Sequence, residues 1–183
     1  RRIAVIGAGV AGLAFAEAAA VRGHDVEVFQ AADAIGGQFR LAAAIPGKEE
    51  YAHTLRYFNR RLIRLGVPVH LGRRVTADEL ADGGYGEIVY SAGVVPRIPE
   101  IEGIDHPSVI AYDDLLDGTR TAGDKVAVIG AGGIGVDVAQ FLIREPNQTL
   151  EEWKASWGVV DPDEVPGGVG KPVPEKSLRE VHL

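Results

Sequence analysis

The stretch RRIAVIGAGVAGLAFAEAA (residues 1–19) decides the fold, because it places a Gly-x-Gly-x-x-Gly motif between an extended apolar run and a run of helix formers. Residues 2–6 are apolar after Arg2 and partly β-branched, which predicts a strand, and residues 11–21 predict a helix. GHDVEVFQ (residues 23–30) predicts a second strand. A strand, glycine turn, helix and strand within about 30 residues indicate the opening of a Rossmann-like α/β fold.

The same pattern returns as KVAVIGAGGIGVDVAQFLI (residues 125–143). Its continuation differs, because NQTLEEWKASWG (147–158) predicts a further helix and residues 158–176, rich in Pro and Gly, predict an inserted loop. LREVHL (178–183) predicts the beginning of a strand. We therefore expect two dinucleotide-binding units, of which the second is incomplete.

Residues 47–65 predict an amphipathic helix, because Tyr51, Leu55, Phe58 and Leu62 recur at helical spacing. Alternating strands and helices imply an α/β fold built from doubly wound parallel sheets. The remaining predicted elements are strands at VPVHL (67–71) and EIVYSAG (87–93) and a short helix at 77–81.

Three prolines, Pro96, Pro99 and Pro107, interrupt residues 94–124, which predicts a connection between two domains. The chain opens without methionine, so we expect an internal piece of a longer protein. The expected organisation is a first nucleotide-binding domain at 1–95, a connection at 96–124, and a second unit at 125–183 with an insertion at 146–177.

Composition narrows the function classes. A formal charge of -7 with scattered basic residues argues against a nucleic-acid surface. The sequence has no 18-residue apolar run and no secretory signal, so neither membrane insertion nor export is expected, and a cytoplasmic location is the default. Without cysteine, redox chemistry would have to come from a cofactor. The five histidines show neither metal-ligand spacing nor a paired acid, so we predict no metal site.

The first glycine motif has the residue types that a dinucleotide pyrophosphate requires. Gly7 permits a tight turn, Gly9 leaves room for the pyrophosphate, and Gly12 lets helix and strand pack closely. The helix that begins near Ala11 presents unpaired N–H groups and a partial positive charge to the phosphates. Gln30 stands where an acid usually binds the ribose hydroxyls, and its amide supplies no charge.

A second glycine pair follows in AIGGQF (34–39). It is either a plain turn or, through Gly37 and Gln38, part of the site for the other end of a long dinucleotide. The longer dinucleotide would be FAD.

In the second motif, Gly130, Gly132 and Gly135 have the same predicted roles as the glycines of the first. Asp137 follows two residues later and is expected in the first helical turn. It is either part of the nucleotide site or simply a favourable charge at a helix N-terminus.

Several stretches resemble the bacterial NADPH-dependent 2,4-dienoyl-CoA reductase group, flavoprotein oxidoreductases of the old-yellow-enzyme and trimethylamine-dehydrogenase type. The resemblance covers nearly the whole chain. The stretches are GAGVAGLAFA, GHDVEVF, IGGQF, IPGKEEYAHTLRYF, SAGVVPRIPEIEGIDHPSVI and VAVIGAGGIGVDVA.

The resemblance implies a parent enzyme of fatty acid β-oxidation with an N-terminal flavin barrel holding FMN, an iron–sulfur cluster, and then this FAD- and NADP-binding region. Electrons would pass from NADPH to FAD, through the cluster to FMN, and on to an enoyl thioester. The choice of NADP over NAD rests on the resemblance alone. The substrate-protonating residues would lie in the barrel and none in this chain.

The resemblance also assigns roles by position. SAG (91–93) stands where related flavoproteins commonly have ATG. The implied FAD-site residues are Gly7, Gly9 and Gly12 at the pyrophosphate with Ala11 beside them, Gln30 at the ribose, Gly37 and Gln38 along the site, Val75 at the adenine, and Ala92 and Gly93 beneath the flavin.

Two alternatives stay open. One is the electron-transfer region of an amine dehydrogenase of the same group, with ADP in the first site. The other is a degenerate nucleotide-binding module with a structural role, which would use a packing surface formed by Trp153 and Trp157, four residues apart on one helical face.

Overall fold

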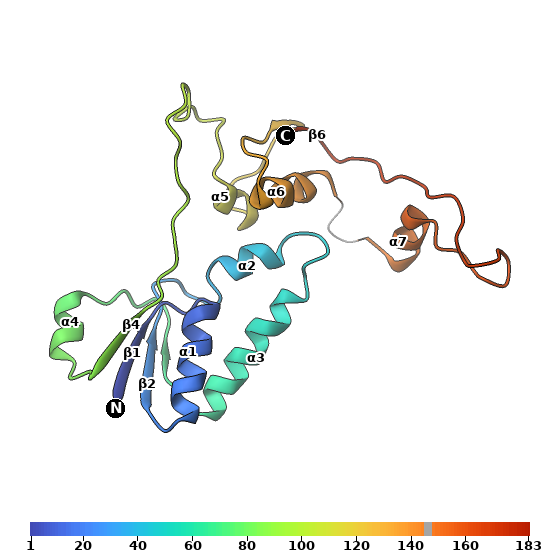
Figure 1. The fold of residues 1–183 in the computed structure, drawn as a ribbon. Helices are drawn as coiled ribbons and strands as arrows, with labels where there is room; N and C mark the ends of the chain where they lie inside the picture. Colours follow the sequence, from blue (N-terminus) through green and yellow to red (C-terminus); the bar gives the residue numbers. More distant parts are fainter. Residues whose placement is uncertain (145–147) are drawn as a thin grey trace. The chain divides into compact units, whose positions relative to one another are not determined.

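The computed structural model describes residues 1–144 and 148–183, which form two compact units, Arg1–Val109 and Ile110–Leu183 (Figure 1). The division falls within the predicted connection 96–124, and the predicted domain bounds stay predictions. Residues 146 and 147, where the predicted insertion and the predicted helix 147–158 begin, lie outside the described residues.

The first unit contains a parallel four-stranded sheet in the order β3-β2-β1-β4, which confirms the predicted strands. The strand order reverses beside β1, because β2 and β3 lie on one side of it and β4 on the other. The crevice beyond the carboxyl ends of such strands is where ligands bind in open α/β sheets. The strands are β1 (Arg2–Ile6), β2 (Asp25–Phe29), β3 (Val69–His70) and β4 (Glu87–Tyr90).

One face of this sheet packs against helices α1 (Val10–Val21) and α3 (Tyr51–Arg64), which lie side by side (Figure 1). The helix predicted at 47–65 is thus confirmed, with a later start, and α4 (Ala77–Asp82) confirms the one predicted at 77–81. Helix α2 (Gln38–Ala43) was not predicted. The core that joins sheet and helices includes Ile3, Val5, Leu13, Val28, Phe58 and Leu62.

The second unit pairs β5 (Lys125–Ala127) with β6 (Glu180–His182) in parallel, which confirms the strand predicted within LREVHL. Its helices are α5 (Tyr112–Leu116), α6 (Gly133–Ile143) and α7 (Leu150–Trp157). Helix α5 lies in a stretch expected to be irregular, and its Leu115 packs with Val138 and Leu142 of α6.

The insertion in the second unit lengthens the connection between helix and second strand. Arg2 pairs with Asp25, 23 positions on, whereas Lys125 pairs with Glu180, 55 positions on, so the second connection is 32 residues longer. We call this long connection between α6 and β6 the excursion. The Leu178 N–H donates to the Ile143 carbonyl at 3.0 Å, so the two ends of the excursion lie next to each other.

Both units show the Rossmann-like parallel α/β class predicted from the sequence. Within the described residues, no helix combines the length and the apolar character needed to cross a bilayer.

Candidate functional site

The first glycine loop lies at the carboxyl end of β1, where the strand order reverses. Gly7 adopts a φ of 104°, a conformation that favours glycine, and Gly7 and Ala8 are buried. Gly9 is the N-cap of α1, and no described side chain caps the helix there. The N–H groups of the first turn are therefore available to an anion.

The three glycines of this loop differ in what surrounds them. A β-carbon on Gly7 would lie 2.3 Å from the carbonyl oxygen of Ser91, and one on Gly12 would lie 2.0 Å from the carbonyl oxygen of Gly7. A β-carbon on Gly9 would meet no described atom within 4 Å. The loop thus has no room for a side chain at Gly7 and Gly12, whereas the space beside Gly9 is open. A backbone that receives a pyrophosphate requires this arrangement.

Ser91, directly after β4, holds the first loop from one side. Its Oγ lies 3.0 Å from the carbonyl oxygens of both Ile6 and Gly7, and its N–H donates to Ile6 at 2.8 Å. Ser91 was not predicted as a site residue. The signal that could have identified it is a hydroxyl directly after a strand that neighbours β1.

Gln30 holds the loop from the other side. Its Oε1 accepts a hydrogen bond from the Ala8 N–H at 2.8 Å. Its backbone is fixed as well, because its N–H donates to His70 and its carbonyl accepts from Arg73. The predicted ribose partner therefore has its side-chain oxygen on the glycine loop.

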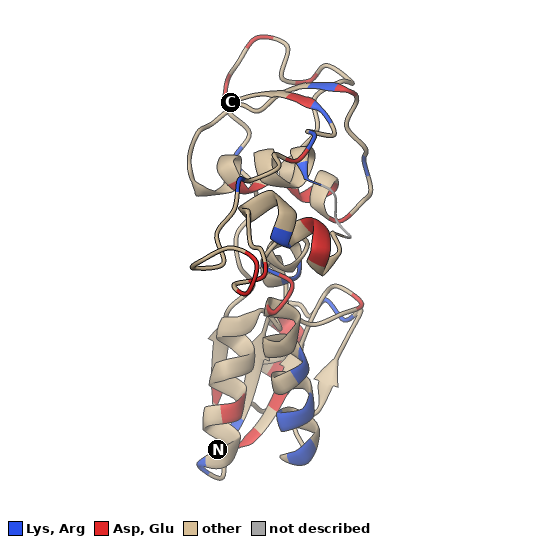
Figure 2. Cartoon of the chain, turned by 90° about the vertical axis from the view of Figure 1, so that its right-hand side faces the viewer, with Lys and Arg blue, Asp and Glu red and all other residues tan. Residues whose placement is uncertain are grey.

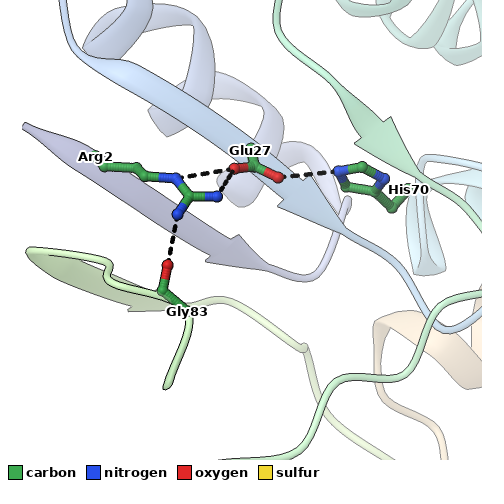
Figure 3. A network of polar contacts seen from close by, with 4 residues as sticks. All are labelled: Arg2, Glu27, His70 and Gly83. Carbon is green, nitrogen blue, oxygen red and sulfur yellow. Dashed lines mark hydrogen bonds and ion pairs between the residues drawn. The ribbon is translucent and has the colours of Figure 1, made fainter. Parts of the chain in front are cut away.

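Glu27, the acid nearest before Gln30, is engaged elsewhere (Figure 3). Figure 3 shows its carboxylate between Arg2 and His70: Oε1 accepts from Arg2 at 2.7 Å, and Oε2 lies 3.2 Å from His70 Nε2. Burial raises the pKa of this carboxyl, but the hydrogen bonds from Arg2 and His70 outweigh it and the pKa is lowered. Arg2 also donates to the Gly83 carbonyl. Glu27 thus does not replace the missing acid at Gln30.

The second glycine pair lies against the first loop. The Gly36 N–H donates to the Ala8 carbonyl at 2.7 Å, and Gly9 and Gly36 form an isolated parallel bridge. A β-carbon on Gly37 would lie 3.6 Å from Gly9 Cα. Gln38 Nε2 donates to the Val94 carbonyl at 3.0 Å, which joins this pair to the loop after β4.

The other residues predicted for the first site lie at its two ends. Ala92 Cα would be 2.9 Å from a β-carbon on Gly7, and Gly93 follows with a φ of 78°. Val75 lines a pocket with Phe29 and Tyr85, close to where Arg73 meets Gln30. Apart from Val75, the predicted residues of the first site thus belong to the first glycine loop and α1, contact that loop, or contact or belong to the segment after β4, and their binding roles stay predictions.

The second loop has nearly the same backbone. Gly130 has a φ of 115°, Gly132 is the N-cap of α6, and a β-carbon on Gly135 would lie 1.7 Å from the Gly130 carbonyl oxygen. Asp137 is the fifth residue of α6, so its predicted place in the first helical turn was wrong. The helix begins at Gly133, one turn ahead of the carboxylate, because the glycines themselves form its first turn.

Among the described residues, charged side chains do not form another candidate site. Four arginines lie along α3, visible as blue segments on the first unit in Figure 2, and one of them, Arg61, is paired with Glu17 at 2.6 Å. In the part of the chain that the structure describes, no cluster of three His, Asp or Glu residues could hold a metal ion.

Comparison with known proteins relates the chain to one family of redox proteins. A sequence model of the family described as "Pyridine nucleotide-disulphide oxidoreductase" matches residues 1–150. A metal reductase of Desulforamulus reducens is 35% identical over 156 residues, which cover 81% of this chain and 23% of that protein. An N,N-dimethylglycine/sarcosine dehydrogenase of Chromohalobacter salexigens is 33% identical over 150 residues, 78% of this chain and 22% of that protein.

Among solved structures, a 2-naphthoyl-CoA reductase in complex with 2-naphthoyl-CoA superposes with a TM-score of 0.73 and 37% identity. The match covers 76% of this chain and 21% of that protein. The chain therefore spans between a fifth and a quarter of the length of these relatives.

Proposed function

The chain belongs to the pyridine nucleotide-disulphide oxidoreductase family, and from that premise we propose that it is the FAD- and NAD(P)H-binding portion of a larger flavoprotein oxidoreductase. FAD would bind at the first glycine loop and NAD(P)H at the second. The family name refers to disulphide chemistry, but none of these 183 residues is a cysteine, so this chain contributes no thiol.

The first glycine loop is the single observation that carries this proposal. It lies at the reversal of the strand order, is closed at Gly7 and Gly12, and is open at Gly9. Gly36 and Gly37 extend the same edge, which supports a dinucleotide as long as FAD.

The chain's own residues would bind and orient the two cofactors. The α1 N-terminus would stabilise the pyrophosphate charge, Ala92 and Gly93 would support the flavin end, and Val75 would meet the adenine. In the second unit, Gly132 and the N-terminus of α6 would hold the nicotinamide dinucleotide, with Asp137 nearby. When bound, these cofactors supply the hydride chemistry, and no catalytic side chain is assigned to this chain.

We further propose that the parent protein passes a hydride from NADPH to FAD, and electrons onward through an iron–sulfur cluster to an FMN-containing barrel. That barrel would reduce 2,4-dienoyl-CoA or a similar enoyl thioester in the cytoplasm. The likeness to 2-naphthoyl-CoA reductase supports a CoA thioester as the substrate class.

Bound-ligand analysis of the purified full-length protein tests this proposal. We expect release of FAD, identified by mass, and bleaching of the flavin absorbance when NADPH is added without oxygen. A protein that releases ADP and shows no bleaching with NADPH or NADH would contradict it.

A second candidate function is the ADP-binding electron-transfer region of an amine dehydrogenase. The 33% identity to an N,N-dimethylglycine/sarcosine dehydrogenase favours it. In that case the first site would hold ADP, and a methylated amine rather than NADPH would reduce the protein. The same ligand analysis separates the two functions, with the amine as the second reductant.

A further inference from the structure

We propose that Gln30 and Ser91 are positioning residues that clamp the first glycine loop from its two neighbouring strands and hold it ready for a dinucleotide. The inference rests on the proposed function, and it gives Gln30 a task other than the ribose contact expected from its position.

The contacts of the two side chains meet on three consecutive residues, the last of β1 and the first two of the loop. Gln30 lies directly after β2, and its Oε1 accepts a hydrogen bond from the Ala8 N–H at 2.8 Å. Ser91, directly after β4, places its Oγ 3.0 Å from the carbonyl oxygens of Ile6 and Gly7. Residues 6–8 are thereby held on both sides of β1 by side chains that are distant in the sequence.

These contacts stabilise the loop because the backbone groups of Ala8 and Gly7 are buried. Ala8 has no exposed surface, and a buried N–H without an acceptor is costly, so the Gln30 oxygen satisfies a donor that water does not reach in this structure. Its neighbour Gly7 is held at a φ of 104° with Ser91 against it. A loop fixed in this way loses less conformational freedom when a ligand binds.

The clamp explains why the absence of an acid at position 30 is compatible with an ordered loop. A hydrogen bond to Ala8 requires an acceptor oxygen but no charge, and a glutamine amide provides one. Leucine has a similar size and no acceptor, whereas glutamate keeps the oxygen. The pair Gln30→Leu and Gln30→Glu therefore separates clamping from simple filling of space.

The test uses the full-length protein, with FAD affinity measured by flavin fluorescence and amide exchange measured with FAD removed. Gln30→Leu and Ser91→Ala should each weaken FAD binding about tenfold, and Gln30→Glu should stay within about threefold of the original. Amide exchange at Ala8 should accelerate in Gln30→Leu and remain slow in Gln30→Glu. The double variant Gln30→Leu/Ser91→Ala should lose less than the product of the single losses, since both side chains hold one loop.

Matched controls are Gln148→Leu and Ser108→Ala, which remove an amide that contacts Glu175 and a hydroxyl that contacts His106. Both should leave FAD affinity unchanged. Unchanged Ala8 exchange in Gln30→Leu, or an equal loss of FAD affinity in Gln30→Leu and Gln30→Glu, would overturn the clamp. Slow exchange at Ala8 that depends on Gln30, in a protein that binds no FAD, would instead keep the clamp and overturn the proposed function.

Discussion

The two glycine loops share a backbone but differ in their enclosure. Gly7 and Gly130 both have positive φ, and Gly9 and Gly132 both act as N-caps in extended conformation. Yet Gly7 is buried against Ser91, whereas a β-carbon on Gly130 would meet no described atom within 4 Å.

The difference shows that the backbone conformation of such a loop is set by the local sequence, whereas its enclosure is not. The backbone conformation follows from the glycine spacing, because each loop must turn from a strand into a helix within a few residues. The enclosure requires neighbouring strands. The first glycine loop follows β1, which has β2 on one side and β4 on the other. The second loop follows β5, which pairs only with β6 among the described residues.

The largest expected effect comes from comparing Gly7→Ala with Gly130→Ala. Both place alanine at positive φ, which costs roughly 1–3 kcal/mol. Gly7→Ala adds the overlap of its β-carbon with the Ser91 carbonyl, so we expect it to destabilise the first unit by about 3 kcal/mol or more. Hydrogen exchange of peptides from β1 and β5 in the full-length protein measures both effects. Equal losses in the two units would show that the enclosure of Gly7 contributes nothing.

A smaller effect is expected at the two capping boxes, one in each unit. Thr76 accepts from the Glu79 N–H in α4, and Thr149 accepts from the Glu152 N–H in α7. Replacing either threonine with alanine should cost about 1 kcal/mol of local helix stability.

Only Thr76→Ala should also weaken FAD binding, by about twofold to fivefold, because Thr76 follows Val75 at the predicted adenine end. Thr149→Ala should leave FAD affinity unchanged, because α7 belongs to the excursion between α6 and β6. Flavin titration of both variants measures this, and reduced FAD affinity in Thr149→Ala would mean that α7 contributes to FAD binding.

The smallest effect concerns pH. Hydrogen bonds from Arg61 and Tyr57 lower the pKa of Glu17 and join α1 to α3 in the first unit. A lowered pKa means that this stabilisation is present above the ordinary carboxyl value and is lost as pH falls through the folded-state value.

Glu17→Gln should therefore melt about 1–3 °C below the original protein at pH 7, and the difference should shrink as pH falls through the lowered folded-state pKa of Glu17. Thermal unfolding of both proteins at pH 7 and at a series of acidic pH values measures this. A difference that stays the same size throughout the series would mean that the charge of Glu17 is not the cause.

Much of the fold could be predicted from the sequence because its signals are local. Strand β1, the glycine turn and helix α1 follow from a run of about 20 residues, and α3 follows from its apolar spacing. The short helices α2 and α5 were missed because QFRLAA and YDDLL are too short to show a helical period.

The site was predictable only in part. The glycines were identified from their spacing, but Ser91 and the Ala8 partner of Gln30 depend on how strands far apart in the sequence align. In the first unit Ala4 of β1 pairs with Glu27, and at the matching position of the second unit Ala127 of β5 pairs with His182. His182 therefore corresponds to Glu27, and the position that corresponds to Gln30 comes after Leu183. The choice between NAD and NADP therefore could not be read from these residues.

We have proposed that the first loop holds FAD and the second NAD(P)H. The most direct test compares Gly9→Val with Gly132→Val in the full-length protein, because a β-carbon at either position would meet no described atom within 4 Å and should not disturb the fold. We predict that Gly9→Val is purified without FAD, whereas Gly132→Val retains FAD but is no longer bleached by NADPH. Retention of FAD by Gly9→Val, or its loss from Gly132→Val, would contradict the assignment of the two loops.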